Sequence, residues 1–107
     1  MNFGANHWGI DLGFPYGTPV LATAFATVDR AEYGHPMRGN NVRLCSWNGW
    51  CATYMHLSWI SVAAGDTVYI SQEIGQVGST GNSTGNHLHY EIRDAGGVPV
   101  DPAPTFP

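Results

Sequence analysis

Apolar and polar positions along this chain alternate with a period of two rather than 3.6. Residues 18–28 (TPVLATAFATV) place small apolar side chains on one face, and residues 87–93 (HLHYEIR) alternate polar with apolar positions. That alternation is typical of strands, because successive strand side chains point to opposite faces of a sheet. No stretch of ten or more residues shows the sustained spacing of an amphipathic helix. We therefore predict an all-β fold with little or no helix.

Turn residues separate the alternating runs, and one turn predicts a hairpin. Asn48-Gly49 lies between two such runs, and Gly49 can adopt the left-handed conformation that ends a three-residue hairpin loop. This loop places Cys45 opposite Cys51, where a disulfide is geometrically plausible and would favour an exported protein. Two buried free thiols are the alternative. A zinc site made by the two cysteines is disfavoured, because no second pair completes it.

Length and charge narrow the class of protein. The 107 residues argue for one domain over 1–107, ending in a Pro/Gly-rich tail at 94–107. A net charge of −4 without any lysine disfavours nucleic acid and anionic membrane surfaces as partners. No apolar run approaches the ~20 residues of a membrane span, and no signal peptide is visible. The abrupt start predicts a domain cut from a longer, multidomain protein.

Candidate metal ligands occur at both ends of the chain. His87 and His89 share one face of a predicted strand, and HWGIDLG places His7 four residues before Asp11. Gly9 lies between the latter two and lets the chain bend, so that both side chains can reach one point. Neutral imidazoles and carboxylates are both good zinc ligands.

These four candidates exceed by one the three protein ligands that a catalytic zinc usually takes. His56, in YMHLS, adds a further imidazole. Histidines that do not bind the metal can act as general base and general acid, because their pKa lies near neutrality. The spacing does not say which histidine binds metal and which moves protons.

Three motifs together resemble a known family. The stretches HWGIDLGFPYGTPVLA, YMHLS and GSTGNSTGNHLHYEIR are similar, in order and spacing, to the lysostaphin/LytM-type zinc endopeptidases of peptidoglycan. The resemblance runs from about Phe3 to the VDP at 100–102. It implies a small, mostly antiparallel β domain with an open groove whose floor holds one zinc ion. It also implies hydrolysis of peptide bonds in peptidoglycan stems or cross-bridges, including glycyl-glycine and D-alanyl bonds.

The resemblance also assigns roles. It implies that His7, Asp11 and His89 bind zinc and that His56 and His87 are catalytic histidines that do not. The implied mechanism is attack of zinc-bound water on the scissile carbonyl, with the two histidines moving protons and stabilising the intermediate. Family domains usually carry a further segment before the first motif, and we expect this chain to lack it.

Further residues near these motifs each have a structural and a substrate-binding interpretation. Asn82, Ser83 and Thr84 precede the histidine pair and form either an ordinary turn or a substrate-binding wall of the groove. Tyr54 lies two residues before His56 and would share its face, either packing in the core or contacting substrate.

The sequence does not assign a single role to two other polar residues. Glu91 either orients a metal ligand or forms an ion pair with Arg93. His35 matches no motif position, and an ordinary role in a loop is the favoured interpretation.

We predict a zinc-dependent endopeptidase of bacterial peptidoglycan, acting as a monomer in the cell wall or extracellular space. It would come from a secreted bacterial hydrolase or a phage lytic protein. One rival is a non-catalytic member of the same fold that binds or regulates other wall hydrolases, but such domains generally lose metal ligands. The other rival is a zinc-stabilised β module with a closed four-ligand site, which leaves His56 without a role.

Overall fold

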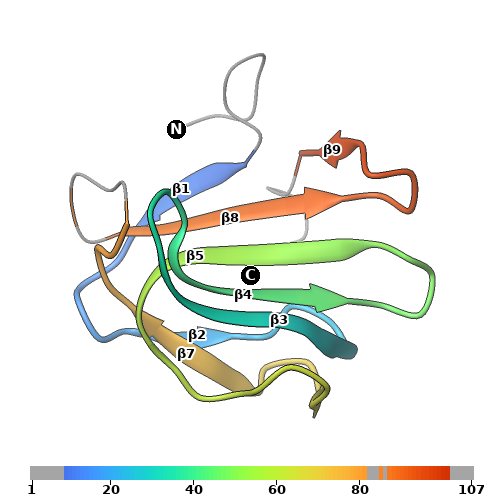
Figure 1. Ribbon diagram of the computed structural model, residues 1–107, viewed down its shortest axis with the longest axis horizontal. Helices are drawn as coiled ribbons and strands as arrows, with labels where there is room; N and C mark the ends of the chain where they lie inside the picture. The colour runs from blue at the N-terminus through green and yellow to red at the C-terminus, as the bar shows by residue number, and fades with distance from the viewer. Residues whose placement is uncertain (1–8, 82–84, 86, 102–107) are drawn as a thin grey trace.

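The computed structural model describes residues 9–81, 85 and 87–101, and in this part of the chain strands and turns occur without a helix (Figure 1). The prediction of an all-β fold is confirmed. The strands are β1 (Ile10–Gly13), β2 (Pro19–Leu21), β3 (Ala26–His35), β4 (Gly39–Cys45), β5 (Cys51–Ile60), β6 (Thr67–Val68), β7 (Glu73–Val77), β8 (His87–Arg93) and β9 (Pro99–Val100).

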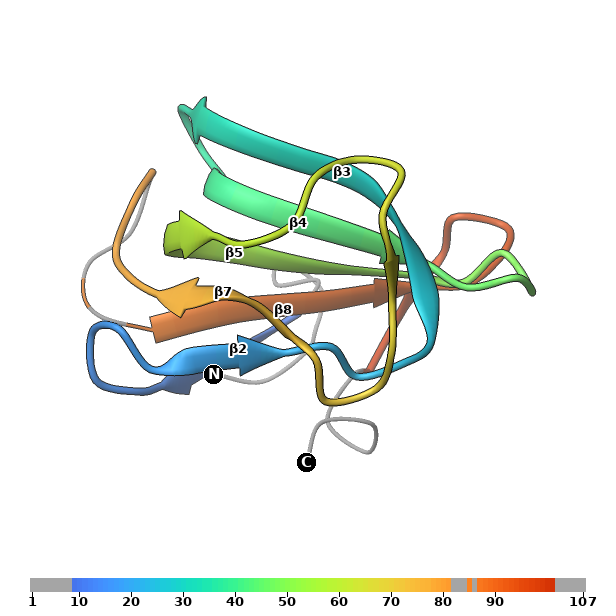
Figure 2. The same ribbon diagram turned by 90° about the horizontal axis from the view of Figure 1, so that it is seen from below.

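The strands form one antiparallel sheet. Its main path runs β1-β8-β5-β4-β3-β6, while β7 pairs with both β2 and β5, and β9 pairs with β8. Figure 1 shows the long strands β3, β4, β5 and β8 side by side. Figure 2 shows that the sheet is curved, with the connection from β2 to β3 closing one side of it.

The hydrophobic core lies on one face of the sheet. Tyr54 and Tyr90 pack there with ring centroids 5.0 Å apart, and both hydroxyls hydrogen-bond to the hydroxyl of Thr23. Because Tyr90 follows His89 in β8, the His89 side chain lies on the opposite face. The other large, fully buried side chains come from six strands and are Val28, Val42, Leu57, Val68, Ile74, Val77 and Leu88.

The alternating run of residues 18–28 is not one strand. β2 ends at Leu21 and β3 begins at Ala26, with bends between them. The backbone of Ala22 bonds to the turn at 71–72, through Gln72 O and Ser71 N. The segment before these bends pairs with β7, and the segment after them pairs with β4. An alternating sequence pattern does not reveal such a change of partner.

The first part of the predicted tail forms a turn and a short strand. Gly96 and Val98 both donate a backbone N–H to the Asp94 carboxylate, and this turn returns the chain so that β9 pairs with β8. The remaining residues of the tail, 102–107, lie outside the described part of the chain. Across the described residues, the fold contains no helix that is long and apolar enough to cross a membrane.

The hairpin between β4 and β5 forms as the Asn-Gly turn predicts. Ser46 N–H donates to Trp50 O, and Gly49, with a φ of 89°, closes the loop through its N–H to Ser46 O. Cys45 and Cys51 are register partners and are joined by a disulfide. The bond therefore ties together the ends of two central strands.

Replacing both Cys45 and Cys51 by serine should lower the free energy of unfolding by about 2 kcal/mol, because the disulfide limits the unfolded chain only over a short loop. Urea denaturation of the wild type and the double variant measures the difference. The wild type under reducing conditions should match the variant. Equal stability of the oxidised wild type and the variant would contradict this expectation.

Candidate functional site

Asp11 and His89 meet because their strands are neighbours. β1 pairs with β8 in a register that sets Asp11 opposite His89, and Asp11 Oδ1 lies 2.6 Å from His89 Nδ1. Both side chains are only partly accessible, 22% and 13% exposed. The structure thus brings together two of the three residues expected to bind zinc. The third, His7, lies outside the described residues.

A second carboxylate lies on the other side of the His89 ring. Glu91, two residues along β8, places Oε1 at 3.8 Å from His89 Nε2. Burial disfavours the charged ring, but the interactions with Glu91 and Asp11 outweigh it and raise the pKa of His89. A carboxylate behind a histidine ligand fixes the orientation of the ring. This position favours an orienting role for Glu91, while Arg93 donates to the carbonyl of Gly97.

Gly9 allows the chain before β1 to pass close to β8. A Cβ atom at this position would collide with the backbone carbonyl oxygen of Tyr90 and the side chain of Glu91, and would lie 3.0 Å from His89 Nε2. Glycine is therefore required here by close packing against the site.

His56 lies at an irregularity of β5. Its φ of 65° is in the left-handed region that residues other than glycine rarely adopt, and the pairing register with β4 shifts between Asn40 and Val42. The backbone N–H of His56 donates to Arg38 O, and the ring centroid lies 6.1 Å from that of His89. A bulge thus turns this histidine toward the site.

The bulge also corrects one expectation. Strict alternation predicted that Tyr54 and His56 share a face, and this is wrong. Tyr54 is 0% exposed and packs in the core against Tyr90, whereas His56 is close to His89 on the other face. Of its two readings, core packing fits the structure, and Tyr54 is not placed to contact a substrate beside His56.

A backbone carbonyl fixes the orientation and tautomer of His56. Nδ1 lies 2.7 Å from Thr80 O, and because a carbonyl oxygen only accepts, Nδ1 must carry the proton. In the neutral ring, Nε2 is then the nitrogen that can take up a proton. Thr80 is itself held, since its hydroxyl donates to Leu57 O and accepts from the backbone N–H of Asn40. Sequence patterns do not indicate this role for Thr80, because it depends on contacts between segments that are distant in the chain.

The remaining expected residues are described only in part. Asn82, Ser83 and Thr84 lie outside the described residues. His87 belongs to β8, where its backbone pairs with Gly13, but its side chain is not described. His35 is the last residue of β3, and its Nδ1 accepts the backbone N–H groups of Met37 and Arg38 in the turn that follows, which fits an ordinary structural role.

The donor atoms that are described fit zinc. Among the described residues, no three His, Cys, Asp or Glu side chains gather into a metal-binding group. Asp11 and His89 nevertheless present a carboxylate oxygen and an imidazole nitrogen at one point, and both are donor types that zinc prefers.

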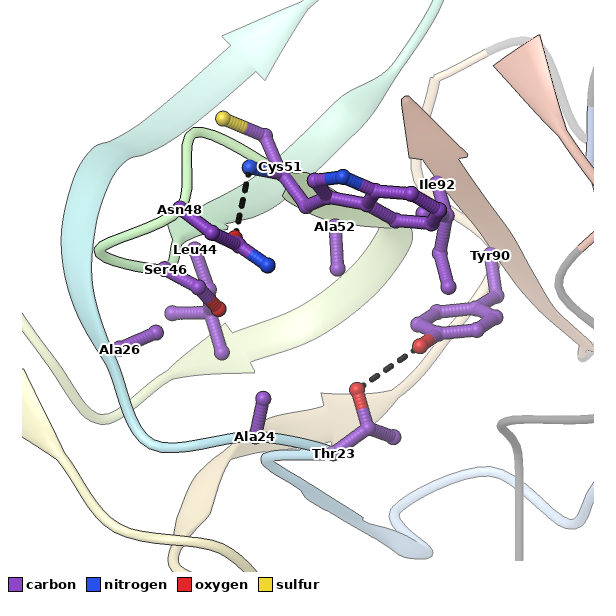
Figure 3. A pocket seen from close by; sticks show the side chains of 11 residues that line it. Thr23, Ala24, Ala26, Leu44, Ser46, Asn48, Cys51, Ala52, Tyr90 and Ile92 are labelled. Carbon is purple, nitrogen blue, oxygen red and sulfur yellow. Dashed lines mark hydrogen bonds between the residues drawn. The ribbon is translucent and has the colours of Figure 1, made fainter. Parts of the chain in front are cut away.

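An apolar pocket of about 200 Å³ lies elsewhere, on the core face of the sheet (Figure 3). Leu44, Trp50 and Ile92 contribute to its lining, and the Tyr90 hydroxyl points across it to Thr23. Because Tyr90 and His89 point to opposite faces of β8, this pocket is separate from the candidate site.

The chain is similar to bacterial peptidases of known name. It is 42% identical over 88 residues to the peptidoglycan DD-endopeptidase ShyA of Vibrio cholerae, covering 82% of this chain and 20% of that protein. The catalytic domain of the antimicrobial peptidase lysostaphin from Staphylococcus simulans superimposes with a TM-score of 0.86 at 36% identity, covering 95% of this chain and 82% of that one. A zinc-containing peptidase from Vibrio cholerae gives a TM-score of 0.83 at 35% identity, covering 88% and 28%.

The chain spans about a fifth of the length of the curated relatives that it matches. Residues 5–102 match the family model described as Peptidase family M23. That range includes all three motifs that suggested the resemblance. The chain belongs to peptidase family M23.

Proposed function

We propose that this chain is a zinc-dependent endopeptidase that hydrolyses peptide bonds in the stems or cross-bridges of bacterial peptidoglycan. The observation that carries the proposal is the meeting of Asp11 and His89 at 2.6 Å, with the His56 ring 6.1 Å from that of His89. Membership of family M23 and the name of the Vibrio cholerae relative support the reaction and the substrate class.

His7, Asp11 and His89 would hold the zinc ion, with Glu91 orienting the ring of His89. Bound there, zinc would supply a Lewis acid that lowers the pKa of a water molecule and polarises the scissile carbonyl. The zinc-containing Vibrio cholerae peptidase supports the choice of metal.

The proton transfers fall to the histidines that do not bind metal. His56, with its Nδ1 proton held by Thr80 O, would accept a proton at Nε2 from the attacking water and return it to the leaving amine. His87, from the same strand as His89, would donate a hydrogen bond to the negative charge that develops on the carbonyl oxygen. Asn82, Ser83 and Thr84 remain proposed contacts to the substrate.

The wider setting is proposed on the same basis. The chain would be one monomeric domain over residues 1–107 within a longer, multidomain wall hydrolase of bacterial or phage origin. It would act in the cell wall, outside the cytoplasm, because its substrate is located there. The chain spans about a fifth of the length of its curated relatives, which fits a catalytic module joined to other domains.

The reaction is tested by mass spectrometry of fragments released from purified peptidoglycan of several chemotypes. Zinc-loaded protein should release fragments with new peptide termini, and a chelator should abolish the release because the metal is removed. Intact walls after incubation with the zinc-loaded protein would favour the non-catalytic alternative.

Replacing His56 by asparagine should lower kcat/KM by about 10²–10⁴-fold, because the proton acceptor is lost. Asparagine suits this test since it tolerates a positive φ better than most residues. Zinc content and thermal stability should stay close to those of the wild type. His35→Asn is the matched control and should retain activity, and comparable losses in the two variants would argue against a catalytic role for His56.

Replacing Asp11 by asparagine should abolish stoichiometric zinc binding, because a charged ligand is removed. Glu91→Gln should weaken zinc binding by about 10–100-fold, as expected for a group that orients a ligand. Both are measured by competition with a zinc-sensitive dye. Asp66→Asn is the control, since the Asp66 carboxylate accepts the backbone N–H of Ala63 in the turn before β6, and the asparagine amide oxygen can accept the same bond. Unchanged zinc affinity in Asp11→Asn would overturn the ligand assignment.

A further inference from the structure

All the fixed positive charge of this chain gathers in one place. The chain has four arginines and no lysine. Arg30, Arg38, Arg43 and Arg93 together line a polar pocket of about 160 Å³. In a chain with a net charge of −4, the arginines are therefore concentrated on one surface rather than spread over the sheet.

The pocket lies across four adjacent strands on the face that carries His89. Pairing sets Arg30 opposite Arg43, Arg43 opposite Thr53, and Thr53 opposite Glu91. Two like charges directly opposite each other on neighbouring strands are destabilising in the absence of compensation. The pairing of Arg30 with Arg43 therefore costs stability unless neighbouring groups offset the repulsion.

Nearby carboxylates compensate the arginines only in part. Glu32 accepts from Arg38 at 3.2 Å and lies 3.9 Å from Arg30, and Asp29 lies 3.5 Å from Arg43. Glu91 also lines the pocket, which leaves one positive charge in excess. Burial and the neighbouring guanidinium groups of Arg38 and Arg43 lower the pKa of Arg30 despite the two carboxylates. Four arginines against the carboxylates of Asp29, Glu32 and Glu91 leave a net positive charge around the pocket.

The pocket is held in a fixed shape and contains an unpaired donor. Arg30 Nε donates to the side chain of Asn41, which is fully buried and donates in turn to Glu32 and Gly39 O. Among the described residues, the buried Nε of Arg38 has no hydrogen-bond partner. A buried donor without a partner costs stability unless a ligand satisfies it.

The pocket is continuous with the candidate site. Met55 and Glu91 form part of its wall, and Met55 is the register partner of His89. Arg43 is in β4, two strands away from His89 in β8, and is displaced from it by two residues along the strand direction. Typical strand spacings then place their two Cα atoms about 12 Å apart. Because arginine side chains are long, they can reach a group about two or three residues from the scissile bond of an extended peptide.

We propose that this arginine pocket binds a free carboxylate of the peptide substrate. The inference rests on the proposed function and narrows its substrate class. Guanidinium groups form charge-assisted, often bidentate hydrogen bonds with carboxylates. The pocket therefore selects stem peptides that carry a free carboxylate near a D-alanyl cross-link over uncharged glycine bridges.

The test compares two forms of one substrate. A D-alanyl cross-linked peptide dimer with free carboxylates is compared with the same dimer after conversion of these carboxylates to primary amides, which removes charge and nearly preserves shape. The zinc-loaded wild type should cleave the free form with a kcat/KM about 10-fold higher or more, corresponding to one charge-assisted hydrogen bond. The preference should decrease at high salt, because the pocket is partly exposed.

Variants assign the preference to the pocket. In Arg43→Gln and in Arg93→Gln the ratio between the two dimers should fall toward one, while the cleavage of the amidated dimer changes little. Arg43→Lys should restore part of the ratio. Gln72→Glu is the control, because it changes net charge by the same unit away from the pocket and keeps the acceptor for the Tyr69 N–H. It should preserve the wild-type ratio.

A binding measurement separates this inference from catalysis. In the Asp11→Asn protein, the free dimer should shift the NMR signals of the arginine Nε–H groups, and the amidated dimer should not. Equal cleavage of both dimers by the wild type, or an unchanged ratio in both arginine-to-glutamine variants, would overturn the inference and leave the proposed function standing. Cleavage of neither dimer, together with intact peptidoglycan, would overturn the proposed function itself.

Discussion

The register of β8 between β1 and β5 is the constraint on which the candidate site depends. It sets His89 opposite Asp11 on one side and opposite Met55 on the other. A shift of one residue in either pairing would turn His89 into the core and Tyr90 out of it. The packing of Tyr90 against Tyr54 therefore does more than fill the core, since it also holds the opposite face of β8 in the alignment that brings His89 to Asp11.

Local sequence patterns predicted those parts of the fold that depend on a single segment. The HLHYEIR alternation correctly separated the His89 face from the buried face of Leu88 and Tyr90, and Asn48-Gly49 correctly placed the hairpin. The same reasoning placed Tyr54 beside His56 because it assumed unbroken alternation. The positive φ at His56 accompanies its contacts to Arg38 and Thr80. These contacts come from other segments, so the alternation of residues along β5 cannot predict them.

What the sequence could not predict arises from pairing between distant segments. Thr80 meets His56 only after β7 has paired with β5, and Arg30 meets Arg43 and Glu91 only through the order of the strands. The arginines are separated by up to 63 positions in the chain, and of the four only Arg93 lies within one of the motif stretches. Their common position on one face is a property of the sheet and not of any one stretch of sequence.

The Cys45–Cys51 bond has a consequence for how the arginine pocket responds to reduction. Cys51 forms part of the wall of the arginine pocket and is the register partner of Arg93. The covalent link therefore anchors this wall at the end of the sheet far from His89. Reduction of the bond would leave this end of the pocket held by backbone pairing alone. It would not break the pairing of β1 with β8 that sets Asp11 opposite His89, so a reducing environment would loosen the pocket wall and spare the candidate metal-binding pair.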